Sequence, residues 1–324
     1  MFRNRIFKIG SSEEFEQLAL EIFQHQAKNN IVYQQFLDIL NFDTSSVKQI
    51  TDIPFLPVDF FKQFKVITGK SIPEQIFLSS GTTGQIQSKH FVLDTSIYEE
   101  SYLKSFEFFY GPIVDYTIIA LLPSYLERDG SSLIYMVDDL IKKTNKLDSG
   151  FYLNDIDTLA EKLNDLNTKD SKILLIGITY ALLDLVEKHQ FKLQNTIVME
   201  TGGMKGKRRE MIREELHDKL CKGFGVTEIH SEYGMTELLS QAYSKGNGIF
   251  KTPPWMKILI RDTEDAFSYL PQYKSGGINV IDLANYNSCS FIATQDLGKT
   301  HPNNTFEVLG RFDHSDIRGC NLMI

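Results

Sequence analysis

The chain has 324 residues, of which 42% are hydrophobic and 23% are charged, as in an ordinary globular protein. Its 34 basic and 42 acidic residues give a net charge of −8, which argues against a nucleic-acid partner and against wide contact with anionic membranes. The longest apolar runs, such as 117–122, are far shorter than the roughly 20 residues that span a bilayer. We therefore expect a cytoplasmic protein without stable membrane insertion.

The first two thirds of the chain alternate between helical and strand-like patterns. Ser11 or Ser12 caps a predicted helix over 11–27, a second helix is expected over 31–40, and the prolines of 51–57 indicate an extended connector. Further strands are predicted at 90–94, 116–122, 172–177 and 195–199. Further helices are predicted at 95–109, 131–143, 156–167, 179–189 and 206–222. This alternation predicts a layered α/β fold with largely parallel strands.

After about residue 238 the pattern changes to strands and turns, as in an antiparallel or barrel-like end. Strands are predicted there at 256–261, 277–283, 290–294 and 306–309. The sequence contains no internal repeat and no low-complexity linker. We therefore predict a single domain over 1–324, with 310–324 as a mobile C-terminal tail.

A run of hydroxyls and glycines follows the short apolar stretch 75–78. It reads Leu78-Ser79-Ser80-Gly81-Thr82-Thr83-Gly84. Glycine lets backbone N–H groups approach a ligand closely, and hydroxyls add donors, so the run suits a polyphosphate. It is not the P-loop pattern, because no Gly-Lys-Ser/Thr follows. Alone, the run could equally be an ordinary tight turn, and Lys89 nearby is either a phosphate ligand or a solvated lysine.

Three later segments match, in the same order, motifs of a known superfamily. They are Glu232-Tyr233-Gly234-Met235-Thr236-Glu237, Thr294-Gln295-Asp296-Leu297-Gly298 and Gly310-Arg311-Phe312-Asp313. With the hydroxyl-rich run, they resemble the adenylate-forming superfamily of acyl-CoA synthetases, luciferases and adenylation domains. Two further segments, 122–128 and 200–206, resemble the acyl-protein synthetases of the LuxE type.

The resemblance implies a fold and a reaction. The fold would be the N-terminal-type adenylate-forming domain with a β-rich C-terminal part, lacking the C-terminal lid domain because the sequence stops soon after the Gly-Arg-x-Asp element. The reaction would be activation of a carboxylic acid, in this family a fatty acid, by ATP and Mg²⁺. The acyl group would then pass to Cys320 and on to an acceptor protein, a reductase or a carrier protein.

The resemblance also implies roles for single residues. The leaving phosphates would be held by Ser79, Ser80, Gly81, Thr82, Thr83 and Gly84. Thr236 would contact the α-phosphate, and Glu237 would bind Mg²⁺, since hard oxygen ligands suit this cation. Tyr233 would lie against the adenine, with Gly202 and Gly203 behind it. Asp296, expected in a loop between strands, would accept both ribose hydroxyls, and Arg311 would contact ribose or phosphate.

Some residues keep two interpretations at this stage. Cys320 is either the acyl acceptor, with Arg318 and His314 lowering its pKa, or an inert cysteine in a tail. His90 either orients substrate or is structural, while Cys221 and Cys289 are expected to be packing residues. The basic cluster 205–209 is either a solvated helix start or added charge near the phosphates.

Three other functions remain open. The acyl group of acyl-AMP could pass to CoA or to a carrier protein supplied in trans. Cys320 could instead take acyl groups from preformed thioesters without ATP. The chain could also be a non-catalytic binding subunit of a larger complex.

Overall fold

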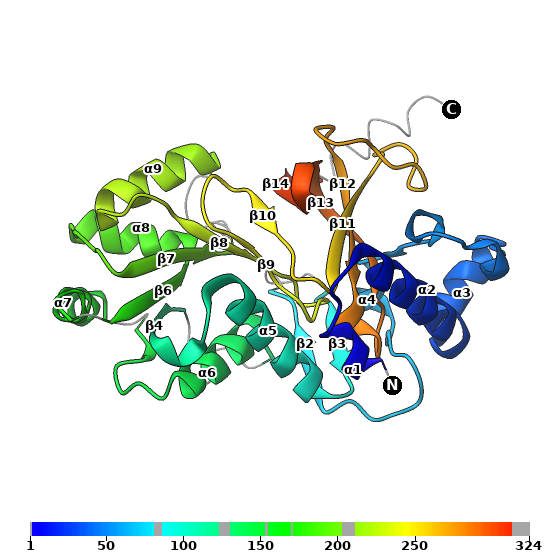
Figure 1. Ribbon diagram of the computed structural model, residues 1–324, viewed down its shortest axis with the longest axis horizontal. Helices are drawn as coiled ribbons and strands as arrows, with labels where there is room; N and C mark the ends of the chain where they lie inside the picture. The colour runs from blue at the N-terminus through cyan, green and yellow to red at the C-terminus, as the bar shows by residue number, and fades with distance from the viewer. Residues whose placement is uncertain are drawn as a thin grey trace. The chain divides into compact units, whose positions relative to one another are not determined.

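The computed structural model describes residues 2–80, 86–122, 130–152, 155–169, 171–202 and 211–312 (Figure 1). The chain forms two compact units. Unit 1 consists of Met1–Glu74, Ser88–Asp94 and Pro254–Ile324, and unit 2 consists of Gln75–Gln87 and Thr95–Pro253. In the part of the chain that is described, no helix has both the length and the apolar character needed to cross a membrane.

Unit 2 contains a largely parallel sheet and five α-helices among its described residues. The strands are β2 (Gln75–Leu78), β4 (Tyr116–Leu121), β5 (Gly150–Phe151), β6 (Lys172–Ile178), β7 (Thr196–Thr201), β8 (His230–Tyr233), β9 (Ala242–Ser244) and β10 (Phe250–Lys251). The helices are α5 (Thr95–Tyr110), α6 (Ser132–Thr144), α7 (Ile156–Asn167), α8 (Thr179–Lys188) and α9 (Arg213–Phe224), with a 3₁₀ turn, η3, at Ile113–Asp115.

The sheet of unit 2 has the order β10-β9-β8-β7-β6-β4-β5. The strands from β5 to β8 run parallel, and β9 and β10 continue the sheet antiparallel. Strand β4 is buried along its whole length and β6 along all but its first residue, as expected for strands covered on both faces. Helices α8 and α9 cover one face of this sheet, and α5 and α6 cover the other (Figure 1).

Unit 1 contains an antiparallel sheet and four α-helices among its described residues. The helices are α1 (Arg3–Ile6), α2 (Ser12–Asn29), α3 (Ile31–Ile39) and α4 (Phe60–Gln63), with 3₁₀ turns at Thr44–Ser46, Ile50–Asp52, Leu283–Asn285 and Pro302–Asn304. The strands are β1 (Leu56–Pro57), β3 (Lys89–Val92), β11 (Met256–Arg261), β12 (Gly276–Asp282), β13 (Phe291–His301) and β14 (Thr305–Arg311). Strands β11 to β14 pair antiparallel in chain order, and β1 pairs parallel with β13.

Aromatic side chains fill the core of unit 1. Phe23 of α2 makes edge-to-face contacts with Tyr33 and Phe291, each with ring centroids 6.1 Å apart. His90 is fully buried in this unit, and its Nε2 lies 3.0 Å from Asn285 Oδ1. This burial supports the structural interpretation of His90.

The predicted α/β fold, with parallel strands first and an antiparallel end, is confirmed by the structure. Two boundaries were wrong. The helix predicted over 206–222 begins at Arg213 in the described chain, after an extended Ile212, while 203–210 lie outside the described residues. The strand predicted at 290–294 continues to His301, so Asp296 lies within β13 and not in a loop. Main-chain pairing with β14, which a search for short apolar runs does not detect, carries the strand past Asp296.

A buried amide links α2 to the segment that precedes β13. Gln26 Nε2 donates to Tyr286 O at 3.0 Å, and Ser290 N donates to Gln26 Oε1 at 3.0 Å. Gln26→Ala should lower the free energy of unfolding by at least about 2 kcal/mol, because it leaves buried backbone groups without partners. Urea denaturation measures this loss, with Gln17→Ala on the exposed side of the same helix as the control. Equal losses in both variants would contradict the role given to Gln26.

Candidate functional site

The predicted phosphate-binding run begins where β2 ends. Ser79 and Ser80 follow Leu78 directly, Ser80 is exposed, and Ser79 O accepts a hydrogen bond from Gln87 Nε2 at 2.7 Å. Leu78 N donates to Gly130 O at 2.7 Å, which connects this strand end to a residue two positions before α6. The other predicted members of the run, Gly81, Thr82, Thr83 and Gly84, lie outside the described residues.

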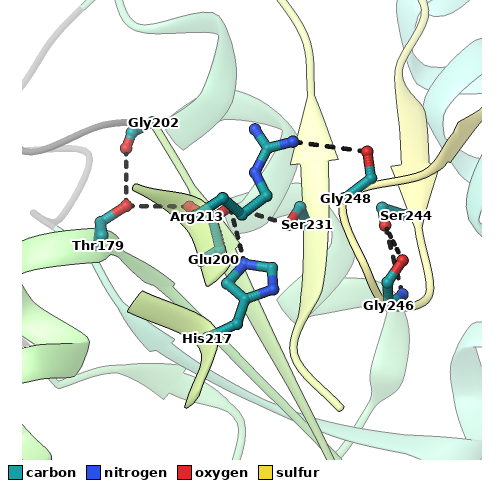
Figure 2. A network of polar contacts seen from close by, with 9 residues as sticks. All are labelled: Thr179, Glu200, Gly202, Arg213, His217, Ser231, Ser244, Gly246 and Gly248. Atoms are coloured by element: carbon teal, nitrogen blue, oxygen red, sulfur yellow. Dashed lines mark hydrogen bonds and ion pairs between the residues drawn. The ribbon is translucent and has the colours of Figure 1, made fainter. Parts of the chain in front are cut away.

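Gly202 forms a left-handed turn at the carboxyl end of β7. Its φ of +66° is readily adopted only by glycine, and its carbonyl accepts a hydrogen bond from Thr179 Oγ1 at 3.1 Å (Figure 2). Thr179 is the first residue of α8, directly after the parallel strand β6. In such sheets, ligands bind outside the carboxyl ends of the strands, so Gly202 stands at the edge where a ligand is expected. Gly203 lies outside the described residues.

Glu200, two residues before Gly202, is the centre of a polar network (Figure 2). Glu200 is only 9% exposed, and its carboxylate accepts a hydrogen bond from Ser231 Oγ at 2.8 Å. Thr179 Oγ1, 3.0 Å from the carboxylate, shares its one hydroxyl proton between Glu200 and the Gly202 carbonyl. His217 Nε2 of α9 lies 3.7 Å from Glu200 Oε1, which is an electrostatic contact and too long for a hydrogen bond. Burial acts to raise the pKa of Glu200, but His217, Ser231 and Arg213 outweigh it and the pKa is lowered. Glu200 is therefore a carboxylate at neutral pH.

The predicted Tyr-Gly-x-Thr-Glu element begins on β8 and continues into a turn. Thr201, the last residue of β7, is in register with Glu232 of the parallel strand β8. Gly202 therefore lies beside Tyr233, the last residue of β8. Tyr233 is 9% exposed, Thr236 is half-buried, and Glu237 is 4% exposed in a turn closed by Leu238 N donating to Met235 O at 3.1 Å. The structure therefore brings Gly202, Tyr233, Thr236 and Glu237 to one end of the sheet of unit 2.

Glu232 lies on the opposite face of the sheet from Glu200, next to Thr201. Thr201 Oγ1 donates to Glu232 Oε2 at 2.6 Å. A Cβ atom on Gly234 would lie 2.5 Å from Glu232 Oε1, so a larger residue there would force the Glu232 carboxyl group to move. Burial raises the pKa of Glu232 to about 7, with the Thr201 hydrogen bond opposing this shift and the charge of Glu200 adding to it.

The remaining predicted site residues, Asp296 and Arg311, belong to unit 1. They are opposite each other in the β13–β14 ladder, and Arg311 Nε lies 3.1 Å from Asp296 Oδ1. The side chain of Asp296 is 7% exposed and that of Arg311 is 75% exposed. Gln295, beside Asp296, donates from Nε2 to Asp59 Oδ2 at 2.6 Å. The Asp296 carboxylate is thus bound by Arg311 on β14, and the adjacent residue Gln295 is fixed by its hydrogen bond to Asp59.

The structure describes two of the three cysteines, Cys221 and Cys289. Cys320, with the residues 313–324 around it, and the basic cluster 205–209 lie outside the described residues. Cys289 is fully buried, and burial raises the pKa of its thiol to about 12. Burial also raises the pKa of Cys221, with help from Asp218 and Glu228. Neither described cysteine is therefore an activated thiolate at neutral pH.

Comparison with known proteins gives a fold. No protein-family model and no curated protein matches the chain. The structure of a 2-hydroxyisobutyryl-CoA ligase with 2-HIB-AMP and CoA in the thioesterification state aligns over 94% of this chain and 70% of its own, with a TM-score of 0.68 and 12% identity. ATP-bound MatB from Rhodopseudomonas palustris aligns over 73% of this chain and 47% of its own, with a TM-score of 0.54 and 16% identity.

O-succinylbenzoate coenzyme A synthetase (MenE) from Bacillus subtilis, in complex with ATP and magnesium, aligns over 73% of this chain and 49% of its own, with a TM-score of 0.51 and 18% identity. The chain has the fold of these ligases. The predicted adenylate-forming fold is thereby confirmed. The chain spans about half the length of MatB and MenE.

Sequence analysis missed three polar residues of this site, Thr179, Glu200 and Glu232. Glu200 and Glu232 lay inside segments that had been singled out, but they received no role. A signal was present, because Glu200 interrupts the apolar run 197–199 and charged residues at the end of a buried strand need partners. Thr179 gave no such signal, since its importance comes from its place at the end of β6.

The raised pKa of Glu232 predicts a pH dependence of stability. Its pKa is near 4.5 in the unfolded chain and about 7 in the folded chain, so the folded state binds the proton more tightly. This stabilisation is full below pH 4.5 and is lost as the pH rises through 7. When the pH rises from 5 to 8, the parent should therefore lose about 1–2 kcal/mol of unfolding free energy, after allowance for solvent screening. Glu232→Gln should not show this loss, because its side chain does not titrate.

Urea denaturation of both proteins at the two pH values measures this difference. Glu161→Gln, which removes an exposed carboxyl from α7, is the control. A Glu232→Gln variant whose stability differs from the parent by the same amount at pH 5 and pH 8 would show that Glu232 does not titrate in this range.

Proposed function

We propose that this protein activates a carboxylic acid with ATP, giving acyl-AMP and pyrophosphate. The observation that carries the proposal is the alignment of 94% of the chain with a CoA ligase that holds an acyl adenylate, together with four superfamily motifs in the same order along the sequence. In unit 2, three of the residues proposed to contact ATP, Gly202, Tyr233 and Thr236, lie at the carboxyl ends of the neighbouring strands β7 and β8. A shared fold alone does not fix the reaction, so the proposal depends on these residues.

In the proposed reaction, a carboxylate oxygen of the acid attacks the α-phosphorus of ATP. The bond from this phosphorus to the bridging oxygen breaks, and pyrophosphate leaves with that oxygen. Positioning and neutralisation of charge account for most catalysis of such a step. Ser79 to Gly84 would hold the leaving phosphates, Thr236 the α-phosphate, and Tyr233, Gly202 and Gly203 the adenine. Asp296 would bind the ribose, and Arg311 would bind the ribose or a phosphate.

The residues present fit a magnesium ion bound together with ATP. Mg²⁺ is usually held by one or two carboxylates and by substrate phosphates, so a dedicated cluster of protein ligands is not required. Among the described residues no group of three or more His, Cys, Asp or Glu side chains could hold a metal. Glu237, buried in the turn after β8, is the proposed carboxylate ligand. When bound, the ion would neutralise charge on the phosphates.

We further propose that the acid is a fatty acid and that Cys320 captures the acyl group before transfer to an acceptor protein. The support is the resemblance of 122–128, 200–206 and the tail to LuxE-type sequences. The thiolate would attack the acyl carbonyl and AMP would leave. The alternative is a thiol supplied in trans, favoured by the CoA in the 2-hydroxyisobutyryl-CoA ligase structure.

Exchange of labelled pyrophosphate into ATP tests the proposed activation, run over a panel of acids from acetate to long-chain fatty acids. We expect exchange that depends on the added acid and is fastest with fatty acids. Exchange with none of the acids would contradict the proposed activation. Exchange with short or polar acids only would contradict the fatty-acid assignment.

Glu237→Gln should fold like the parent but slow pyrophosphate exchange at least about tenfold, since one charge-assisted ligand is lost. High Mg²⁺ should restore part of the rate, because the loss affects metal binding. The exchange rate is measured against Mg²⁺ concentration, with Glu264→Gln, an exposed glutamate of unit 1, as the control. Parental rates in Glu237→Gln at low Mg²⁺ would remove this residue from the proposed site.

Cys320→Ser should keep pyrophosphate exchange but lose a hydroxylamine-sensitive acyl adduct, because a serine hydroxyl is a much weaker nucleophile than a thiolate. Mass spectrometry after incubation with ATP and a fatty acid detects the adduct. An adduct on Cys221 or Cys289 would overturn the assignment. Exchange without any adduct would favour transfer to a thiol in trans.

A further inference from the structure

The side chain of Arg261 lies where the two motifs of unit 1 meet. Arg261 ends β11, while Thr294 and Asp296 lie on β13 and Phe312 follows β14. No motif contains Arg261. Its guanidinium nevertheless contacts Thr294 of the Thr-x-Asp-x-Gly element and Phe312 of the Gly-Arg-x-Asp element.

The guanidinium is held by three hydrogen bonds. Nη1 donates to Ile278 O and to Asn279 Oδ1, each at 2.8 Å, and Nη2 donates to Thr294 O at 2.6 Å. The planar fork of arginine can reach all three acceptors at once, whereas the single ammonium group of a lysine cannot reproduce this arrangement. Burial lowers the pKa of Arg261, and the nearby Tyr269 and Asp296 oppose this shift. The guanidinium is therefore half-buried and held in one orientation by its hydrogen bonds.

Thr294 connects Arg261 to Asp296 through hydrogen bonds. Its hydroxyl donates to Ile278 O at 2.8 Å and accepts from Asp296 N at 3.1 Å. Arg261 of β11 binds the carbonyl of the same threonine, so the carbonyl and the hydroxyl of Thr294 are fixed by β11 and β12 respectively. The backbone N–H of Asp296 is therefore bound by Thr294, whose carbonyl Arg261 holds, and the carboxylate of Asp296 is bound by Arg311 from β14.

Arg261 also contacts the residue that follows β14. Its guanidinium carbon lies 5.6 Å from the centre of the Phe312 ring, and Phe312 N donates to Gln295 O at 2.9 Å. Space for the guanidinium comes from Gly277, because a Cβ atom there would lie 2.5 Å from Arg261 Cζ. The sequence thus provides both the arginine and the gap that it occupies.

We infer that Arg261 is a positioning residue that sets the orientation of the Asp296 carboxylate and thereby the selectivity of this protein for the ribose hydroxyls of its nucleotide. The inference rests on the proposed function, because Asp296 is the proposed ribose ligand. Arg261 itself touches no substrate in this account and acts through Thr294. A carboxylate held in one orientation can accept from two neighbouring hydroxyls, whereas a loosely held one loses much of that preference.

The test compares binding of three magnesium nucleotides, ATP, 2′-deoxyATP and 3′-deoxyATP, by isothermal titration calorimetry. The parent should bind ATP at least about tenfold more tightly than either deoxynucleotide, the value of one hydrogen bond to a charged group. Arg261→Lys should reduce this ratio about fivefold or more. Asp296→Asn should abolish it, and Arg5→Lys, at an exposed arginine of the same unit, should keep it.

Gly277→Ala gives a second variant in which the arginine remains but must move, because the new methyl group takes the place of the guanidinium. It should reduce the ribose preference in the same way as Arg261→Lys. This variant keeps the inference testable if substitutions of Arg261 prevent folding.

Each outcome has one meaning. A parental ATP preference in Arg261→Lys and Gly277→Ala, even with a lowered unfolding midpoint, would show that Arg261 only stabilises the sheet and would overturn the inference. A parent that binds ATP without ribose preference would overturn the assignment of Asp296. A parent that binds none of the nucleotides would overturn the proposed function as well.

Discussion

The arrangement of unit 2 depends on one buried carboxylate that must be matched by donors. Glu200 receives hydrogen bonds from Thr179 at the start of α8 and from Ser231 on β8, and it lies beside His217 of α9. A buried charge without such partners would cost several kcal/mol, so these three elements are held around the end of β7. The left-handed turn at Gly202 follows directly and is fixed through the same threonine. One electrostatic requirement therefore shapes the edge where the nucleotide is proposed to bind.

Alternation of side chains along parallel strands then separates two carboxyl groups with different properties. Glu200 faces the layer of α8 and α9 and has a lowered pKa, whereas Glu232 lies on the other face beside Thr201 and has a pKa raised to about 7. Neighbouring carboxyls whose pKa values move apart are typical of functional sites. In unit 1, the Asp296 carboxylate is bound by Arg311 from β14, while Arg261 from β11 binds the carbonyl of Thr294, two residues earlier. Both units thus present acidic groups that are fixed by the fold before any ligand binds.

Local patterns were sufficient to predict most of the fold, because apolar periodicity and capping residues act over a few neighbours. The helix predicted over 95–109 is observed at Thr95–Tyr110, and the strand predicted at 116–122 at Tyr116–Leu121. Asp296 was placed wrongly because its strand is defined by pairing with β14, which no local pattern reveals. The partners of Glu200 and Arg261 come from distant parts of the chain, so local patterns did not reveal these contacts either. Motifs identified candidate residues, and the tertiary structure supplied their contacts.

Hydrogen–deuterium exchange with and without ATP and Mg²⁺ tests the central claim most directly, since it needs no knowledge of the acid. If the nucleotide binds at the carboxyl ends of β7 and β8, peptides that contain Gly202 and the turn from Gly234 to Leu238 should exchange more slowly in its presence. Peptides from α7, which contains none of the proposed ligands, serve as the internal reference. Unchanged exchange of the Gly202 and 234–238 peptides at saturating ATP and Mg²⁺ would contradict the account.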